Sequence, residues 1–195
     1  MINEYKSWLS DNAVALDNLM KEAEHLKEGS NVLVLGSLSL IPAMLLYDSV
    51  KNVHIDAYFT DDEISDDFFI NTDSEHIVNR VSELKKTHYD LIFSFFSLNM
   101  SKKSSVVPLL FSLEEALNKD GRFLLYLEDS LNIEVGEGKE EKAFFSSCDE
   151  IMYKRYMLSD IVQTLSLLNL KIVDIEEVKV ENIPHAVAIT ASKSM

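Results

Sequence analysis

Small and polar residues follow three apolar runs, at positions where each run would end as a strand. Gly36 and Ser37 follow the run from Val32 to Leu35, and Ser94 lies near the end of a later run. Asp56 closes a run about twenty residues after the glycine, and a carboxylate there can accept hydrogen bonds from both ribose hydroxyls. Glycine permits close approach of a ligand to the backbone. The spacing predicts a site for a nucleoside-containing cofactor, with a plain turn glycine and a solvated acid as the structural alternatives.

Two phenylalanines and an asparagine extend the third of these runs, and an acid follows a later one. Phe95, Phe96 and Asn99 lie at the predicted carboxyl end of their strand, and Asp129 follows the run from Arg122 to Glu128. Ligands bind outside the carboxyl ends of strands in open α/β sheets. An aromatic ring here could stack on a ligand, and Asp129 could orient a substrate. Burial of both rings in the core is the alternative, because the core is the usual location of phenylalanine.

The composition argues against several classes of function. The chain has 195 residues and a formal net charge of −15, which disfavours binding to nucleic acids and to anionic membranes. Its most apolar stretch, residues 32–47, is shorter than the roughly 20 residues of a membrane-spanning helix. The amino terminus has no signal-peptide pattern, and the single cysteine, Cys148, cannot form an intrachain disulfide. These features predict a cytoplasmic protein with a small-molecule substrate.

The remaining ionisable residues do not form a recognisable catalytic or metal-binding set. The histidines His54, His76, His88 and His185 show no metal-ligand spacing, and the acids of residues 61–67 are typical of a solvated face. We therefore predict no metal site. The sequence also lacks a catalytic triad, which is compatible with a reaction that depends on alignment of reactants and exclusion of water.

The order of the predicted elements indicates an α/β sheet domain. Helices are predicted at residues 3–28, 42–50, 75–86, 104–118 and 153–170, and strands at residues 32–35, 52–58, 68–71, 89–96, 122–128, 171–180 and 185–191. The continuous apolar run from Val32 to Leu35 is typical of a strand covered on both faces, as in a parallel sheet. The short turn at residues 181–184 must join antiparallel strands, because parallel neighbours need a longer crossover.

We therefore predict a Rossmann-like three-layer α/β sandwich. Its mostly parallel seven-stranded sheet ends in a C-terminal antiparallel strand. Residues 1–195 are expected to form a single domain, with an N-terminal helical segment at residues 1–30. Residues 129–156 are polar and weakly patterned, so we interpret them as a lid or an insertion on the substrate side.

Four segments resemble the class I S-adenosylmethionine-dependent methyltransferase family. Residues 31–36 (NVLVLG) resemble its first strand and leading glycine, and residues 53–56 (VHID) its second strand with a terminal acid. Residues 89–99 (YDLIFSFFSLN) resemble its fourth strand and the loop that faces substrate. Residues 115–125 (EALNKDGRFLL) resemble its helix, glycine turn and fifth strand. The resemblance extends over residues 28–191.

The resemblance implies S-adenosylmethionine as cofactor and assigns roles to the candidate residues. The cofactor would contact Gly36, Ser37, Asp56, Asp73, Ser74, Ser94 and Phe95, and the acceptor would contact Phe96, Asn99 and Asp129. Within the first set, Asp56 would hold the ribose, and Asp73 would lie near the adenine amino group. Asp73 and Ser74 follow the predicted third strand, where the alternative role of either is a helix cap. The segment after the fourth strand lacks the Asn/Asp-Pro-Pro-Tyr pattern of methyltransferases that act on nucleobase or glutamine amines, which again disfavours a nucleic-acid substrate.

One departure from the family pattern leaves three hypotheses open. Leu38 and Leu40 occupy positions where the family usually has further glycines. They could fill the space for the methionine part of the cofactor, or the loop could take another route with Ser37 or Ser39 facing the ligand. The first hypothesis is methyl transfer to a small molecule, and the second is an inactive methyltransferase-like protein that acts as a binding or assembly partner. The third, a nicotinamide-dependent dehydrogenase, is disfavoured by the closing hairpin. The oligomeric state is left open.

Overall fold

The computed structural model describes residues 16–59, 77–100, 103–129, 141–142, 152–153, 157–180 and 183–193. The strands are β1 (Asn31–Leu35), β2 (His54–Tyr58), β3 (Val78–Val81), β4 (Tyr89–Phe95), β5 (Leu117–Glu128), β6 (Glu141–Lys142), β7 (Met152–Tyr153), β8 (Leu170–Val180) and β9 (Ile183–Lys193). The helices are α2 (Asp17–Ala23), the 3-10 turn η1 (Ser37–Ser39), α3 (Leu40–Ser49), α5 (Ser97–Met100), α6 (Lys103–Ala116) and α7 (Leu158–Leu167).

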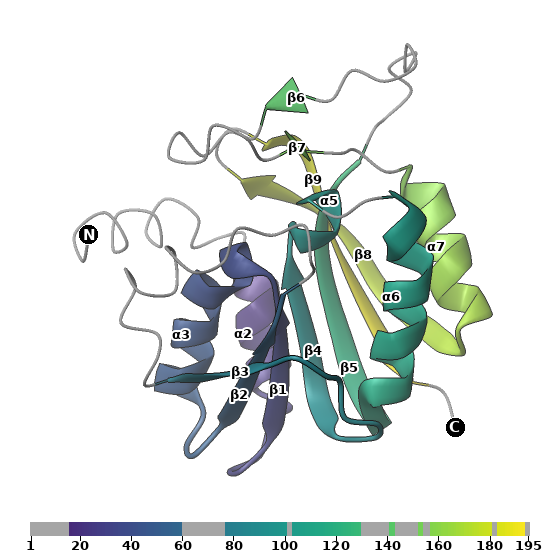
Figure 1. Cartoon of the computed structure of the whole chain (residues 1–195). Helices are drawn as coiled ribbons and strands as arrows, with labels where there is room; N and C mark the ends of the chain where they lie inside the picture. Colours follow the sequence, from purple (N-terminus) through teal and green to yellow (C-terminus); the bar gives the residue numbers. More distant parts are fainter. Residues whose placement is uncertain are drawn as a thin grey trace.

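Seven strands form one sheet in the order β3-β2-β1-β4-β5-β9-β8 (Figure 1). Strands β1 to β5 pair in parallel, whereas β9 pairs antiparallel with both β5 and β8. The predicted mostly parallel seven-stranded sheet with a C-terminal antiparallel strand is therefore confirmed. A nicotinamide-binding doubly wound sheet has six strands in the order 3-2-1-4-5-6. The inserted antiparallel β9 distinguishes this sheet from that arrangement and argues against the dehydrogenase hypothesis.

Two layers of helices cover the two faces of the sheet (Figure 1). Apolar residues of α2 and α3 pack with Val32 and Val34, whereas those of α6 and α7 pack with Leu33 and Leu35. Successive side chains of a strand point to opposite faces. Residues 32–35 are consequently all buried, which explains why this strand is a continuous apolar run and not an alternating one.

The predicted elements between β2 and β4 are wrong in their described part. Residues 78–81 were expected in a helix spanning 75–86, but they form β3, which pairs in parallel with Ile55–Tyr58 of β2. Pairing satisfies the outer backbone groups of β2, and this long-range gain outweighs the weak helical pattern of the segment. The predicted strand at residues 68–71 lies outside the described residues.

Several other predicted boundaries change. Of the helix expected at residues 3–28, the described part contains α2 at Asp17–Ala23, and the helix expected at 153–170 contains α7 at Leu158–Leu167. Tyr153 belongs to β7, which pairs with β6 within the segment interpreted as a lid. Most of that segment lies outside the described residues, as do residues 1–15 of the N-terminal segment 1–30, so the roles of both segments remain predictions.

A partly buried ion pair attaches α2 to the sheet. Arg122 Nη1 donates to Glu22 Oε1 over 3.2 Å, and the second oxygen of this carboxylate has no hydrogen-bond partner among the described residues. Burial raises the pKa of the Glu22 carboxyl above its ordinary value, against the opposing effect of Arg122. A raised pKa means that the folded state binds this proton more tightly than the unfolded state. The stabilisation is therefore present at low pH and is lost as the pH rises through the raised pKa.

We expect Glu22→Gln to remove this pH dependence. Relative to the unmodified protein, the free energy of unfolding of the variant should rise between acidic and neutral pH, because glutamine does not ionise and so avoids the cost of burying a charge. Urea unfolding at a series of pH values measures the difference. Glu24→Gln is the control, since Glu24 is exposed on the same helix end. Parallel stability profiles for the Glu22 variant and the unmodified protein would contradict the prediction.

Candidate functional site

Gly36 forms a tight turn at the carboxyl end of β1. Its φ of 72° lies in the region that residues other than glycine rarely adopt. Its N–H donates to the carbonyl of Tyr58 over 2.9 Å, and its own carbonyl accepts from the Ser39 N–H over 3.2 Å. The turn thus joins the ends of β1 and β2 and leads directly into η1 and α3. The backbone geometry favours glycine here, and this edge of the sheet is where ligands bind in such folds.

Two buried hydroxyls connect the ends of β1 and β4. Ser39 and Ser97 both donate to the carbonyl of Leu35, and the Ser39 hydroxyl accepts the N–H of Phe95 over 2.8 Å. These contacts commit the Ser39 hydroxyl to the backbone. The alternative in which Ser39 faces a ligand is therefore not supported. The side chain of Ser37 lies outside what the structure describes.

The two leucines of the glycine-poor loop pack toward the core. Leu40 is fully buried in the cluster under α3, and Leu38 is half-buried against the same cluster. Leu40 begins α3 and serves as a core residue of that helix. The packing of both leucines between η1, α3 and the sheet explains why these positions are apolar. Their presence therefore does not imply that they fill a ligand site.

Asp56 does not end its strand as predicted, because β2 continues to Tyr58. Its Oδ1 accepts from the Asn79 amide and its Oδ2 from the Tyr89 hydroxyl, both over 2.9 Å, and Lys85 Nζ lies 3.6 Å from Oδ2. Burial and the Asp56 carboxylate together raise the pKa of the Tyr89 hydroxyl, so it remains a donor. Asp56 therefore connects β2, β3 and the start of β4. The carboxylate that was expected to hold a ribose is engaged inside the fold.

The aromatic residues at the end of β4 are core residues. Phe95 and Phe96 are almost completely buried, and their rings meet edge to face with centroids 4.7 Å apart. Phe96 has a φ of 57°, which places this non-glycine residue in the left-handed region at the end of the strand. Its N–H donates to the carbonyl of Tyr126 over 3.0 Å. This packing agrees with the alternative prediction that both rings are buried in the core.

Ser94 has a different environment from the other edge residues. It lies beside Leu35 of β1 and Leu125 of β5 in the sheet. Its hydroxyl is buried and has no hydrogen-bond partner among the described residues. Most buried polar groups in native structures are hydrogen-bonded. An orphan hydroxyl near the carboxyl end of β4 therefore fits a ligand contact.

Asn99 and Asp129 stabilise the same edge of the sheet. The Asn99 side chain accepts the Glu128 N–H over 3.2 Å and donates to the Glu128 carbonyl over 3.4 Å. Asp129 Oδ1 accepts the N–H of Leu158 over 3.0 Å at the start of α7. The structure thus brings Ser94, Phe95, Phe96, Asn99 and Asp129 to one end of the sheet. Asn99 and Asp129 hold backbone there.

Sequence reasoning missed a half-buried apolar group at the ends of β2 and β3. Tyr58 and Val81 end these strands, and Leu84 follows; all three pack against the cluster on the α6 face. Alternate residues of a strand lie on the same face, so Tyr58 lies on the same face as Asp56. This alternation in the sequence could have indicated Tyr58 as a site residue. Asp73 and Ser74 lie outside the described residues. The strand expected to precede them, at residues 68–71, also lies outside the described residues, and β3 follows them in the sequence.

No group of three or more His, Cys, Asp or Glu side chains in the described part of the chain could hold a metal ion. No helix within the described ranges is long and apolar enough to cross a membrane.

Comparison with known proteins identifies the fold. No protein-family model matches the sequence, and no curated protein matches it at a significant level. Solved structures match over almost the whole chain. The 1,6-didemethyltoxoflavin-N1-methyltransferase of Burkholderia thailandensis, with bound 1,6-didemethyltoxoflavin and S-adenosylhomocysteine, has a TM-score of 0.64 and 15% identity, covering 98% of this chain and 87% of that one. The chain has a class I S-adenosylmethionine-dependent methyltransferase-like fold.

Two further structures support this methyltransferase-like fold. The protein bound to the Trm112 methyltransferase activator of Haloferax volcanii gives a TM-score of 0.70 at 10% identity, covering 98% of this chain and 93% of that one. The TehB-like S-adenosylmethionine-dependent methyltransferase of Corynebacterium glutamicum gives 0.60 at 13% identity, with both chains covered completely. At such identities the similarity establishes the fold and leaves substrate and activity to experiment.

Proposed function

We propose that the protein transfers a methyl group from S-adenosylmethionine to a small-molecule acceptor. The observation that carries this proposal is the Gly36 turn, which lies at the adjoining carboxyl ends of β1 and β2 in a methyltransferase-like sheet. The first structural neighbour described above has a bound adenosyl ligand and a small-molecule acceptor. The net charge of −15 supports a small acceptor over a nucleic acid.

The described residues fit the adenine base of this cofactor better than its ribose hydroxyls. Tyr58, Val81 and Leu84 offer half-buried apolar surface for a base, and Ser94 offers a hydroxyl that has no hydrogen-bond partner among the described residues. Asp56 is engaged elsewhere, so the group that accepts the ribose hydroxyls must come from another position. Asp73, Ser74 and Ser37 remain proposed contacts outside the described side chains.

The cofactor, when bound, supplies an electrophilic methyl group on a sulfonium. The protein has to align the acceptor with that group and to exclude water, because orientation dominates such transfers. Asn99 and Asp129 contribute by fixing the backbone of Glu128 and the start of α7 at the edge where the acceptor would bind. We propose that residues 129–156 cover that edge.

Ligand binding tests the proposal without an assay for the unknown acceptor. At about 100 times its dissociation constant, S-adenosylmethionine or S-adenosylhomocysteine should raise the melting temperature by about 5 to 10 °C. Adenosine triphosphate serves as the control nucleotide. No change in melting temperature with millimolar S-adenosyl ligands would contradict the proposed activity.

Ser94→Ala should change the stability of the free protein and the effect of the ligand in opposite directions. Removing an orphan buried hydroxyl should raise the stability of the free protein by about 1 kcal/mol. The same variant should show a smaller ligand-induced rise in melting temperature, because the hydroxyl is then missing from the site. An unchanged ligand-induced rise would exclude Ser94 from the binding site.

A catalytically inactive methyltransferase-like protein that binds or assembles with a partner is the second candidate. The engagement of Asp56 by Asn79, Tyr89 and Lys85 favours it, because no described acid is left at the end of β2. One structural neighbour is bound to a methyltransferase activator. The thermal shift experiment distinguishes the two candidates, since only the first requires that an S-adenosyl ligand bind.

A further inference from the structure

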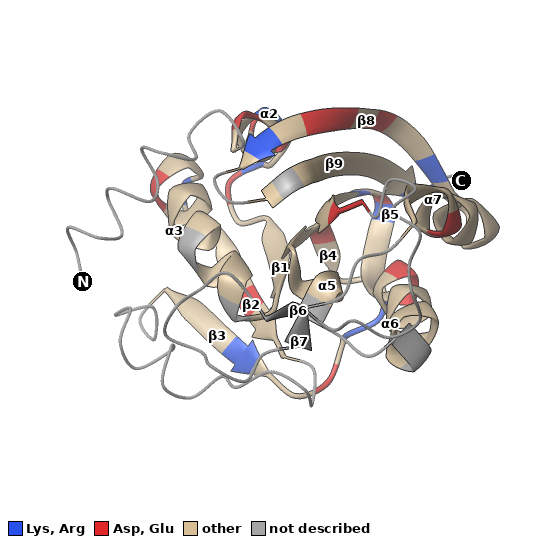
Figure 2. Cartoon of the chain, turned by 90° about the horizontal axis from the view of Figure 1, so that it is seen from above, with Lys and Arg blue, Asp and Glu red and all other residues tan. Residues whose placement is uncertain are grey.

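The outermost strand β8 presents a long acidic edge. It ends the seven-stranded sheet, and its pairing within the described residues is with β9 alone. Its exposed residues are Lys171, Val173, Asp174, Ile175, Glu176, Glu177 and Lys179. In Figure 2 the acids form the middle of β8 and the basic residues lie toward its ends. Edge strands are normally short or covered, because their free backbone groups can pair with another chain. β8 is long for an edge strand, with 11 residues.

The side chains of β8 divide between the two faces of the sheet. Asp174 and Glu176 pair with Thr190 and Ala188 of β9 and so lie on the face of α2. Ile175 pairs with Ile189, whose side chain packs on the α6 and α7 face. It is 40% exposed, and the nearby Val173 is 51% exposed. Glu177 pairs with Val187 and so lies on the same face as Ile175. The edge is therefore acidic on both sides, and Ile175 and Val173 are its exposed apolar residues.

A second copy of this strand would be a poor partner. If two copies paired antiparallel with their sheets facing the same way, the central registers would place Asp174 opposite Asp174, Asp174 opposite Glu176, or Glu176 opposite Glu176. Like charges directly opposite each other destabilise a strand pair. Residues at the centre of β8 thus discourage self-association and favour an added strand of opposite charge.

We propose that β8 binds an extended, basic segment of another protein as an eighth strand of the sheet. Lysine or arginine at alternate positions of that segment would face Asp174 and Glu176, and apolar residues between them would cover Ile175. The N–H of Ile175 donates to the carboxylate of Asp174 over 2.9 Å. A basic side chain that draws this carboxylate away frees the N–H for the added strand. Main-chain hydrogen bonds then give affinity, and the alternating side chains give specificity.

A synthetic peptide of alternating lysine and valine, about ten residues long as in a typical strand, is the probe. Fluorescence anisotropy should show binding to the full-length protein. The same peptide with every valine replaced by proline keeps all charges but cannot form a strand, and it should bind at least about tenfold more weakly. Equal binding of the two peptides, or no binding of either, would overturn the proposal.

Two matched double variants locate the site. Asp174→Asn with Glu176→Gln should weaken peptide binding about tenfold. Glu24→Gln with Glu28→Gln removes the same charge from exposed residues that follow the end of α2 and should leave the affinity unchanged. Hydrogen exchange in residues 174–179 should slow when the peptide binds. Equal losses in the two double variants, or slowed exchange only in other strands, would show general charge attraction and would refute strand addition at β8.

Discussion

Asp56→Ala is expected to lower the free energy of unfolding by about 3 kcal/mol, because it leaves two donors without their acceptor. The Tyr89 hydroxyl is fully buried, and the Asn79 amide crosses from β3 to the same carboxylate. The variant also removes the contact that joins the start of β4 to β2. Urea unfolding measures the loss. Asp56→Asn, which retains one acceptor, should be intermediate and should keep the protein folded.

A double-mutant cycle with Tyr89→Phe distinguishes this structural role from a ribose-binding role. The two substitutions should couple by about 1 to 2 kcal/mol, as expected for side chains in direct contact. The rise in melting temperature caused by an S-adenosyl ligand should persist in Asp56→Asn. Unchanged stability together with loss of the ligand effect would instead assign Asp56 to the cofactor.

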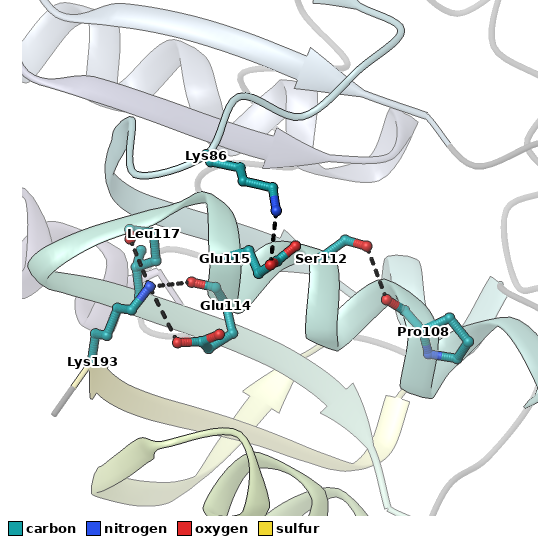
Figure 3. Close-up of polar contacts among 7 residues, drawn as sticks. All are labelled: Lys86, Pro108, Ser112, Glu114, Glu115, Leu117 and Lys193. Atoms are coloured by element: carbon teal, nitrogen blue, oxygen red, sulfur yellow. Dashed lines mark hydrogen bonds and ion pairs between the residues drawn. The ribbon is translucent and has the colours of Figure 1, made fainter.

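Lys193→Met is expected to destabilise the protein by about 2 kcal/mol, because it removes a charged cap from the end of α6. Figure 3 shows the ammonium group of Lys193 facing the last turn of that helix. Lys193 Nζ donates to the carbonyls of Glu114 and Leu117 over 2.7 and 3.1 Å, and it lies 3.1 Å from Glu114 Oε1. The carbonyls at a helix C-terminus have no partners within the helix. A cation there also interacts favourably with the negative end of the helix dipole. Methionine keeps most of the apolar stem and removes the donor.

Lys86→Met is the matched control for this experiment. Lys86 forms an ion pair of 2.9 Å with Glu115, the neighbour of Glu114 on the same helix (Figure 3). Its side chain is 73% exposed, and that of Glu115 is 38% exposed, against 20% for Lys193 and 13% for Glu114. Exposed pairs contribute between zero and about 1 kcal/mol, so the control should lose less than about 0.5 kcal/mol. Equal losses at the two lysines would contradict the capping role.

The sequence alone determined the parts of the fold that depend on local pattern. The apolar runs of β1 and β4 predict strands buried on both faces, and the short connection before Ile183 requires an antiparallel hairpin. Gly36 follows β1 directly, as its place after the apolar run predicts. Each of these features follows from spacing along a few neighbouring residues, so no distant contact was needed to predict it.

Only the tertiary structure decided what the polar residues of the site contact. The same carboxylate at Asp56 could hold a ribose or join three strands, and the outcome depends on Asn79 and Tyr89, which are distant in sequence. Asn99 and Asp129 likewise bind backbone of β5 and α7. The strand β3 forms because β2 offers an unpaired edge. A polar side chain has hydrogen-bonding capacity that its sequence neighbours do not fix, and the folded sheet supplies the partner.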